Sequence, residues 1–246
     1  MPVVEFESQK TDPLVPEHRP SPSKSKLRVL WIHDTAVRVG GCEQYMVRAA
    51  QLLKKHDVES SLLYGDAVDG RLEMLDSFDA SYPMVDLARQ LDAIKPDVIY
   101  AHRIAGCSVL NAITDSRVPT LRFFHDHKLF CPREHKYTVL TKTTCTRSIG
   151  PGCVACMGVI NRSEKWPGVR FQSVGQLRAE QRAHSGLRGY VVGSQYMADH
   201  LTAHGFDADK IHVLPLFVDP PSDSTRAMPN PFELLFVGQI VRGKGL

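Results

Sequence analysis

The chain lacks any long apolar run. Of its 246 residues, 43% are hydrophobic and 23% are charged, but no segment approaches the roughly 20 apolar residues that a membrane-spanning helix needs. The first residues also lack the basic and then apolar order of a signal peptide. We therefore expect a cytoplasmic protein with one sizeable core and part of a second.

Two binding signatures are absent as well. No cluster of lysines and arginines is interleaved with aromatic residues, so nucleic acid is not an expected partner. The fingerprint G-x-G-x-x-G is missing, which argues against a nicotinamide or flavin dehydrogenase. A net charge of +3 suits anionic ligands or peripheral contact with the inner face of a membrane, and it selects neither.

What the chain does have is a regular alternation of apolar runs and helical periodicities. It predicts strands at residues 27–33, 60–64, 97–101, 120–124, 189–192 and 211–214, and helices at 43–56, 87–95, 108–114, 174–184 and 195–204. Strict alternation implies right-handed crossovers between parallel strands. The predicted fold class is therefore α/β, with a doubly wound, mostly parallel, Rossmann-like sheet.

Composition suggests how the chain is divided. Residues 1–25 are rich in proline and predict a disordered leader. Residues 26–218 predict one domain, in which the periodicity fails at about 130–170 and indicates a functional or otherwise ordered insertion. Four prolines in 219–231 predict a linker. We expect residues 232–246 to open a second domain that the chain does not complete.

Glycines predict two sites of close approach to a ligand. Gly40 and Gly41 lie where the first strand passes into the first helix, and glycine lets the backbone approach a phosphate or a sugar. A tight turn without a ligand is the alternative. Residues 233–237 predict a further buried strand, which runs into a second turn in which Gly238, Arg242 and Lys244 predict contact with an anion.

Polar residues at strand ends are further candidates. His102 and His125 end predicted strands, where a histidine can donate to a substrate hydroxyl or phosphate, and Asp126 follows the second of them. Structural histidines and a turn-forming aspartate are the alternatives. Ser194 precedes a helix, which predicts an N-cap or, more boldly, a ligand contact.

Four of the six cysteines are grouped within the aperiodic segment. Cys131, Cys145, Cys153 and Cys156 have the spacing C-x13-C-x7-C-x2-C. Four soft ligands could hold a structural zinc ion, or by ligand type an iron–sulfur cluster. Unliganded thiols in an insertion are the alternative.

Taken together, these segments resemble retaining glycosyltransferases of family 4, which have the GT-B fold. The matching segments are Gly40-Gly41-x-Glu43 and residues 95–102, 118–126, 191–194, 210–215 and 234–245. The resemblance implies an N-terminal domain that binds a saccharide or lipid-linked acceptor, and a C-terminal domain that binds a nucleotide-sugar donor. The resemblance implies a transfer reaction that requires no cofactor.

The resemblance also implies roles for single residues. Gly40 and Gly41 would approach the donor phosphates or the acceptor, and His125 would line the sugar site, which makes His125 and Asp126 the catalytic candidates. Lys244 matches the diphosphate-binding lysine of the family.

Two departures from the family pattern limit the expected activity. Gln239 stands where the family has an arginine, which removes a bidentate cation. The acidic pair of the family lies beyond the residues of this chain, and catalysis depends on two domains closing around the donor. We therefore expect the chain alone to have little or no activity. The alternatives are a non-catalytic sugar- or phosphate-binding module, a truncated remnant, or a metal-dependent regulator.

Overall fold

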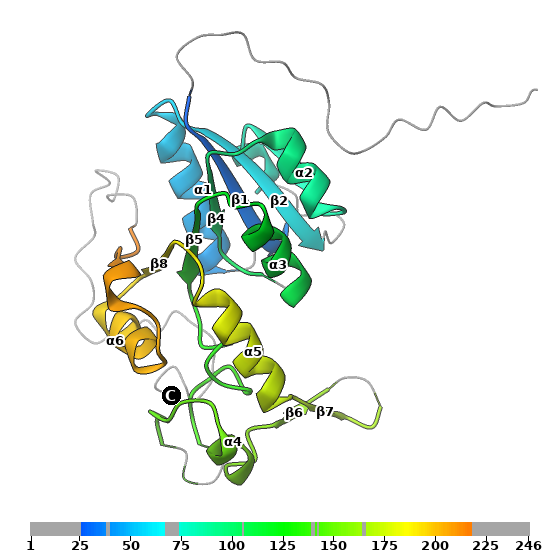
Figure 1. The fold of residues 1–246 in the computed structure, drawn as a ribbon, viewed down its shortest axis with the longest axis vertical. Helices are drawn as coiled ribbons and strands as arrows, with labels where there is room; N and C mark the ends of the chain where they lie inside the picture. The colour runs from blue at the N-terminus through cyan, green and yellow to red at the C-terminus, as the bar shows by residue number, and fades with distance from the viewer. Residues whose placement is uncertain are drawn as a thin grey trace, which may run out of the picture. The chain divides into compact units, whose positions relative to one another are not determined.

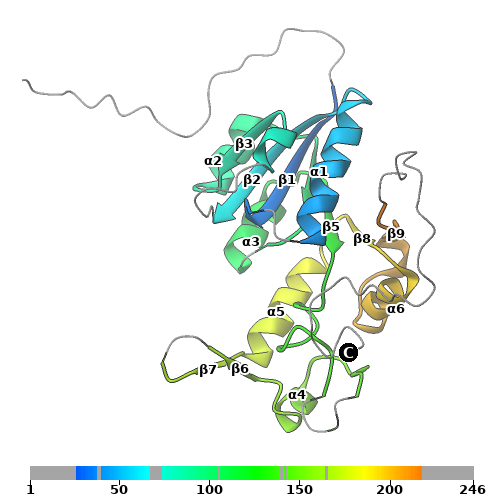
Figure 2. The ribbon, with the colours of Figure 1, turned by 180° about the vertical axis from the view of Figure 1, so that it is seen from behind.

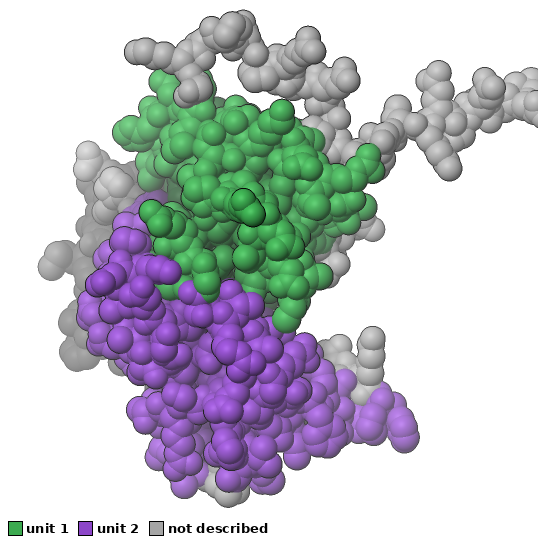
Figure 3. All heavy atoms as spheres, viewed as in Figure 1, with its two compact units in different colours: residues 1–123, 186–191 green, residues 124–185, 192–246 purple. Residues whose placement is uncertain are grey.

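The computed structural model describes residues 26–37, 40–66, 74–104, 106–138, 141, 143–163 and 166–217. Contacts divide the chain into two compact units (Figure 3). Unit 1 comprises residues 1–123 and 186–191, and unit 2 comprises residues 124–185 and 192–246.

A seven-stranded sheet confirms the predicted α/β class. Its strands, in spatial order, are β3 (Ala80–Pro83), β2 (Glu59–Asp66), β1 (Arg28–Thr35), β4 (Val98–Ala101), β5 (Thr120–Phe124), β8 (Gly189–Val192) and β9 (Ile211–Val213). Strand β1 pairs in parallel with β2 and β4, β2 pairs in parallel with β3, and β4 with β5. The alternation predicted every one of these strands except β3.

Strand β1 is buried on both faces. The side chains of Leu30, Trp31 and Ile32 are all 0% exposed. Trp31 packs against Phe78 and Tyr100, with ring centroids 5.8 and 5.0 Å away. A central parallel strand that is covered on both faces has to be apolar along its whole length, which explains the unbroken apolar run in the sequence.

Three helices cover the sheet of unit 1: α1 (Gly41–Lys54), α2 (Leu87–Ile94) and α3 (Cys107–Asp115), with a 3₁₀ turn η1 (Leu75–Ser77). The chain moves from β1 to β2 in one direction and from β3 across to β4 and β5 in the other. Right-handed crossovers therefore put α1 on one face and the later helices on the opposite face. Figures 1 and 2 show this arrangement, which is the predicted doubly wound form.

Local sequence sets the ends of the helices. The Asp86 carboxylate accepts the Arg89 N–H at 3.2 Å and begins α2. That helix ends at Ile94, its C-cap Lys95 has a left-handed φ of 50°, and Pro96 follows. Proline disfavours helical geometry in the residue before it, so the helix stops there.

Unit 2 contains α4 (Pro151–Ala155), the antiparallel pair β6 (Ile160–Arg162) and β7 (Val169–Phe171), α5 (Val174–His184), α6 (Gln195–Ala203) and the 3₁₀ turn η2 (Ala208–Lys210). The sequence predicted α5 and α6 but missed the short elements between 130 and 170. Phe124, Phe130 and Phe206 form its aromatic core, with ring centroids 5.5 to 5.8 Å apart. Among the described residues, no helix is long and apolar enough to cross a membrane.

Truncation of β1 tests its structural importance. We expect Leu30→Ala to lower the free energy of unfolding by about 2–5 kcal/mol, because it leaves a cavity at a fully buried position. Leu27→Ala is the matched control: Leu27 is 48% exposed, and a loss of about 0.5 kcal/mol or less is expected. Urea denaturation measures both, and equal losses would contradict the central role of β1.

Candidate functional site

The sheet reverses its strand order between β1 and β4. Strands β2 and β3 lie to one side of β1, whereas β4, β5, β8 and β9 lie to the other. At such a switch point the loops after the two strands diverge, and ligands of open α/β sheets bind in the crevice between them. Unit 1 therefore has a candidate site at the carboxyl ends of β1 and β4.

Gly40 and Gly41 lie at this switch point, where the chain enters α1. Gly40 is the N-cap of α1, Gly41 is its first residue, and both are exposed. A Cβ added at Gly41 would meet no atom within 4 Å. The first turn of a helix carries a partial positive charge and presents N–H groups outward, so an anion could approach this end of α1.

The buried Glu43 carboxylate holds the glycine turn in place. The Glu43 carboxylate accepts the Gly40 N–H at 2.8 Å, and its other oxygen lies 3.5 Å from Nε2 of His33. The same nitrogen lies 3.5 Å from Sγ of Cys42. The ligand atoms of these three side chains lie within 4.8 Å of one another, a possible metal-binding arrangement. Because Glu43 also accepts the Gly40 N–H, we infer that these three side chains position the glycine turn.

His33 is neutral near pH 7. Burial is the main cause that lowers its pKa, although the Thr35 carbonyl and the carboxylates of Asp34 and Glu43 act in the opposite direction. Its Nδ1 lies 2.8 Å from the Thr35 carbonyl oxygen. The Thr35 backbone nitrogen also lies 3.2 Å from Nδ1, so the tautomer decides whether Nδ1 donates to the carbonyl or accepts from this N–H.

An ion pair joins the two strand ends. Arg103 follows β4, and its Nε lies 3.3 Å from a carboxylate oxygen of Asp34, the seventh residue of β1. The two side chains are 32% and 25% exposed. Arg103 therefore places a guanidinium, a group suited to phosphate or carboxylate, at the switch point.

His102 is built into the aromatic core of unit 1. It is 1% exposed, and its ring stacks between Trp31 and Phe123, with centroids 5.3 and 5.6 Å away. Its backbone N–H donates to the Ile32 carbonyl at 2.9 Å, which extends the ladder between β1 and β4. These contacts support a structural histidine, and a ligand contact by His102 stays a prediction.

The predicted catalytic pair lies directly after β5, in unit 2. His125 is half-buried. Asp126 accepts the Lys128 N–H at 2.9 Å, which is the contact of a turn-forming aspartate. Ser194 is the N-cap of α6, since its hydroxyl accepts the Met197 N–H at 3.4 Å. The N-cap prediction for Ser194 is confirmed, whereas the catalytic roles of His125 and Asp126 stay predictions.

A histidine cluster that the sequence analysis missed packs inside unit 2. His200 lies 4.9 Å from His127 and 4.2 Å from His204, measured between ring centroids. The Lys136 ammonium lies 3.2 Å from Nε2 of His204. Burial first, and then the neighbouring His204, Lys136 and His127, lower the pKa of His200 to about 3.

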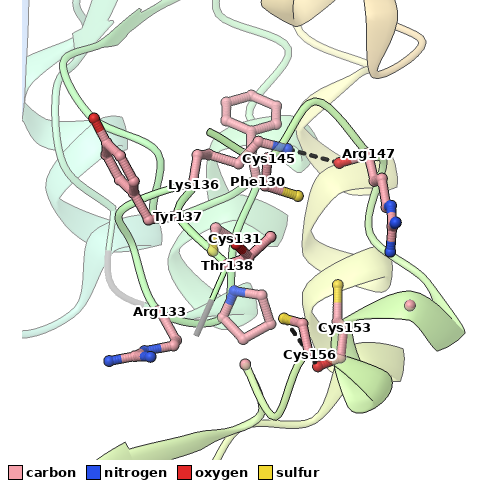
Figure 4. Close-up of a pocket in the computed structure, with 13 residues that line it drawn as sticks. Phe130, Cys131, Arg133, Lys136, Tyr137, Thr138, Cys145, Arg147, Cys153 and Cys156 are labelled. Carbon is pink, nitrogen blue, oxygen red and sulfur yellow. Dashed lines mark hydrogen bonds between the residues drawn. The ribbon is translucent and has the colours of Figure 1, made fainter. Parts of the chain in front are cut away.

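The four grouped cysteines come together around one pocket (Figure 4). They approach it from the turn after Phe130, from the segment that follows the Tyr137–Thr144 bridge, and from α4 with the residue after it. None of the six cysteines, all of which lie in the described part of the chain, forms a disulfide bond. The pocket is lined by Cys131, Cys145, Cys153 and Cys156 together with Lys136, Arg133, Arg147 and six further residues.

Some predicted residues lie outside the described part of the chain. Gly238, Arg242 and Lys244 belong to this group. Conversely, the rule that singled out His102 and His125 also applies to His33, which ends the first predicted strand, and to Asp34, which follows it. The i, i+4 spacing of His200 and His204 in the predicted helix 195–204 was the signal for the histidine cluster.

Together, the doubly wound sheet and the switch-point site define a Rossmann-like α/β protein. The model of Glycosyltransferase Family 4 matches residues 39–221. The chain belongs to this family, and the predicted resemblance is confirmed.

Solved structures are similar at low identity. They include HepE of Anabaena in complex with UDP, which has 15% sequence identity; the match covers 78% of this chain and 45% of that chain with a TM-score of 0.47. The lipopolysaccharide outer core galactosyltransferase WaaB has 12% sequence identity, and the match covers 84% of this chain and 49% of that chain with a TM-score of 0.45. The UDP-GlcNAc 2-epimerase of Neisseria meningitidis has 15% sequence identity, and the match covers 76% of this chain and 45% of that chain with a TM-score of 0.42. The chain spans about half the length of these structures. The search of curated proteins gives no match.

The histidine cluster predicts how stability depends on pH. Below about pH 6.5 the unfolded chain protonates His200, whereas the native ring takes up a proton only near pH 3. Unfolding therefore takes up a proton in this window, and stability falls as the pH falls. We expect His200→Gln to make the slope of unfolding free energy shallower by up to about 1.4 kcal/mol per pH unit.

Denaturant titrations at several values between about pH 6 and pH 4 measure this slope. His56→Gln is the matched control, because His56 is exposed. Identical slopes for the two variants would contradict a buried neutral His200.

Proposed function

We propose that this chain forms the acceptor-binding half, and part of the donor phosphate site, of a glycosyltransferase that uses a nucleotide-sugar donor. Membership of family 4 over residues 39–221 supports the reaction class. The observation that carries the proposal is the exposed Gly40–Gly41 turn at the start of α1, directly at the switch point of the sheet. An anionic leaving group is what this turn is suited to accept.

In this proposal the leaving group is a nucleoside diphosphate. Its phosphate oxygens would face the first N–H groups of α1, where the helix dipole favours negative charge that develops as the glycosidic bond breaks. The Arg103 guanidinium, held by Asp34, lies at the neighbouring strand end and adds a cation. The buried Glu43 carboxylate keeps Gly40 in position.

We propose that the acceptor is a saccharide or a lipid-linked saccharide, and that His125 lines the sugar site at the end of β5. The family resemblance implies transfer with retention of the anomeric configuration. NMR of the first-formed product distinguishes retention from inversion.

A substitution at Gly41 tests the role of the turn. The full-length protein that the gene encodes is assayed with a panel of UDP-, GDP- and ADP-hexoses. We expect Gly41→Val to lower kcat/KM by roughly 10- to 100-fold, which corresponds to the loss of one charge-assisted hydrogen bond. The new side chain has room in the folded protein, since a Cβ there meets no atom within 4 Å. The loss would therefore reflect the approach of the ligand.

Gly175→Val is the matched control. Gly175 is also an exposed glycine in the first turn of a helix, the second residue of α5. Equal activities of the two variants would contradict a ligand at the Gly40–Gly41 turn. Binding of a nucleotide-sugar without transfer to any saccharide acceptor would favour a non-catalytic binding module instead.

A further inference from the structure

We propose that Cys131, Cys145, Cys153 and Cys156 bind one structural Zn²⁺ ion, which orders the segment between β5 and α5. The proposal does not depend on the glycosyltransferase activity, because it concerns a different part of the chain. It rests on the composition and size of the pocket, on the charges around it and on how little apolar packing this segment has.

The pocket has the composition of a soft-metal site. Its thirteen lining residues include the four cysteines and no carboxylate or histidine. Calcium and magnesium need oxygen ligands, which excludes them here, whereas four thiolates are a common ligand set of structural zinc. The cavity measures about 30 Å³. That is room for a single ion and is far below the roughly 300 Å³ of a small-molecule site.

The surrounding charges fit the same ion. Zn²⁺ with four thiolates carries a net charge of 2−. Lys136 lines the pocket at 2% exposure, and both hydrogen-bond partners of its ammonium are neutral: the Arg147 carbonyl oxygen at 2.7 Å and Nε2 of His204 at 3.2 Å. A buried cation needs a compensating negative charge. The zinc–thiolate group would supply that charge, with the lining residues Arg133 and Arg147 adding to the complementarity.

The segment lacks a core of its own. Among the described residues from 131 to 163, Ile149 is the one buried large aliphatic side chain, at 3% exposure. Three non-glycine residues have left-handed backbones: Glu134, Lys136 and Met157, with φ of 66°, 54° and 56°. Such conformations persist where surrounding interactions enforce them. A metal bound to four points of the segment would provide these interactions.

The four thiols would have to move closer together to bind one ion. Figure 4 shows the four sulfur atoms around the same pocket. Although all four cysteines are described, no three of their sulfur atoms lie within 4.8 Å of one another. The Cys156 thiol donates to the Cys153 carbonyl oxygen at 3.6 Å, and it would give up this contact on binding the ion. Binding releases the thiol protons to solvent and changes no oxidation state.

Elemental analysis of the full chain, purified under reducing conditions without chelator or added metal, tests the proposal. We expect one zinc per chain. Single substitution of each pocket cysteine by serine should lower the zinc content at least severalfold. Cys107→Ser is the matched control, since Cys107 is a half-buried cysteine at the start of α3 in unit 1, and it should leave the zinc content unchanged.

Two readouts on the wild-type chain keep the test independent of how the variants fold. Cobalt exchanged for zinc should give the visible absorption of a tetrahedral thiolate site. Removal of the metal by a chelator should speed proteolysis within residues 131–163 by about tenfold or more, because the apo segment opens more often. Iron with inorganic sulfide, a Cys153–Cys156 disulfide, or four reactive thiols without metal would each overturn the proposal.

Discussion

Burial of β1 on both faces is the constraint on which the rest of unit 1 depends. Leu30, Trp31 and Ile32 lose all contact with water, and this requires strands on both sides and helices above and below. Once β2 and β4 flank β1, right-handed crossovers force the chain to wind in two directions from it. The reversal of strand order beside β1 follows from this winding, so the site at its carboxyl end is a consequence of how the core is covered.

The same end of β1 carries polar residues that a strand interior would not tolerate. His33 is fully buried, yet its ring nitrogens have the Thr35 carbonyl, Cys42 and Glu43 as neighbours. Glu43 in turn accepts the Gly40 N–H. Buried polar groups are tolerated when they have partners. This network links the end of the strand to the start of α1 and presents the glycine turn outward.

Unit 2 is stabilised in a different way. Phe124, Phe130 and Phe206 form a small aromatic core, and the buried histidines pack beside it. The residues between 131 and 163 contribute little apolar surface, and their positions depend on polar contacts such as that of Lys136 with Arg147. A segment of this kind needs a second source of order, which the four thiols around one pocket are placed to supply.

The sequence by itself determined six of the seven strands of the sheet, because an apolar run and a helical period reflect local burial that neighbouring residues share. It also located Gly40, Gly41 and the cap Ser194, which act through local geometry. It did not predict β3, the short elements of unit 2, the stacking of His102 between Trp31 and Phe123, or the pair of Asp34 with Arg103. Only the tertiary structure decided these, because each depends on contacts between residues far apart in the chain, or on segments too short and irregular to have a period.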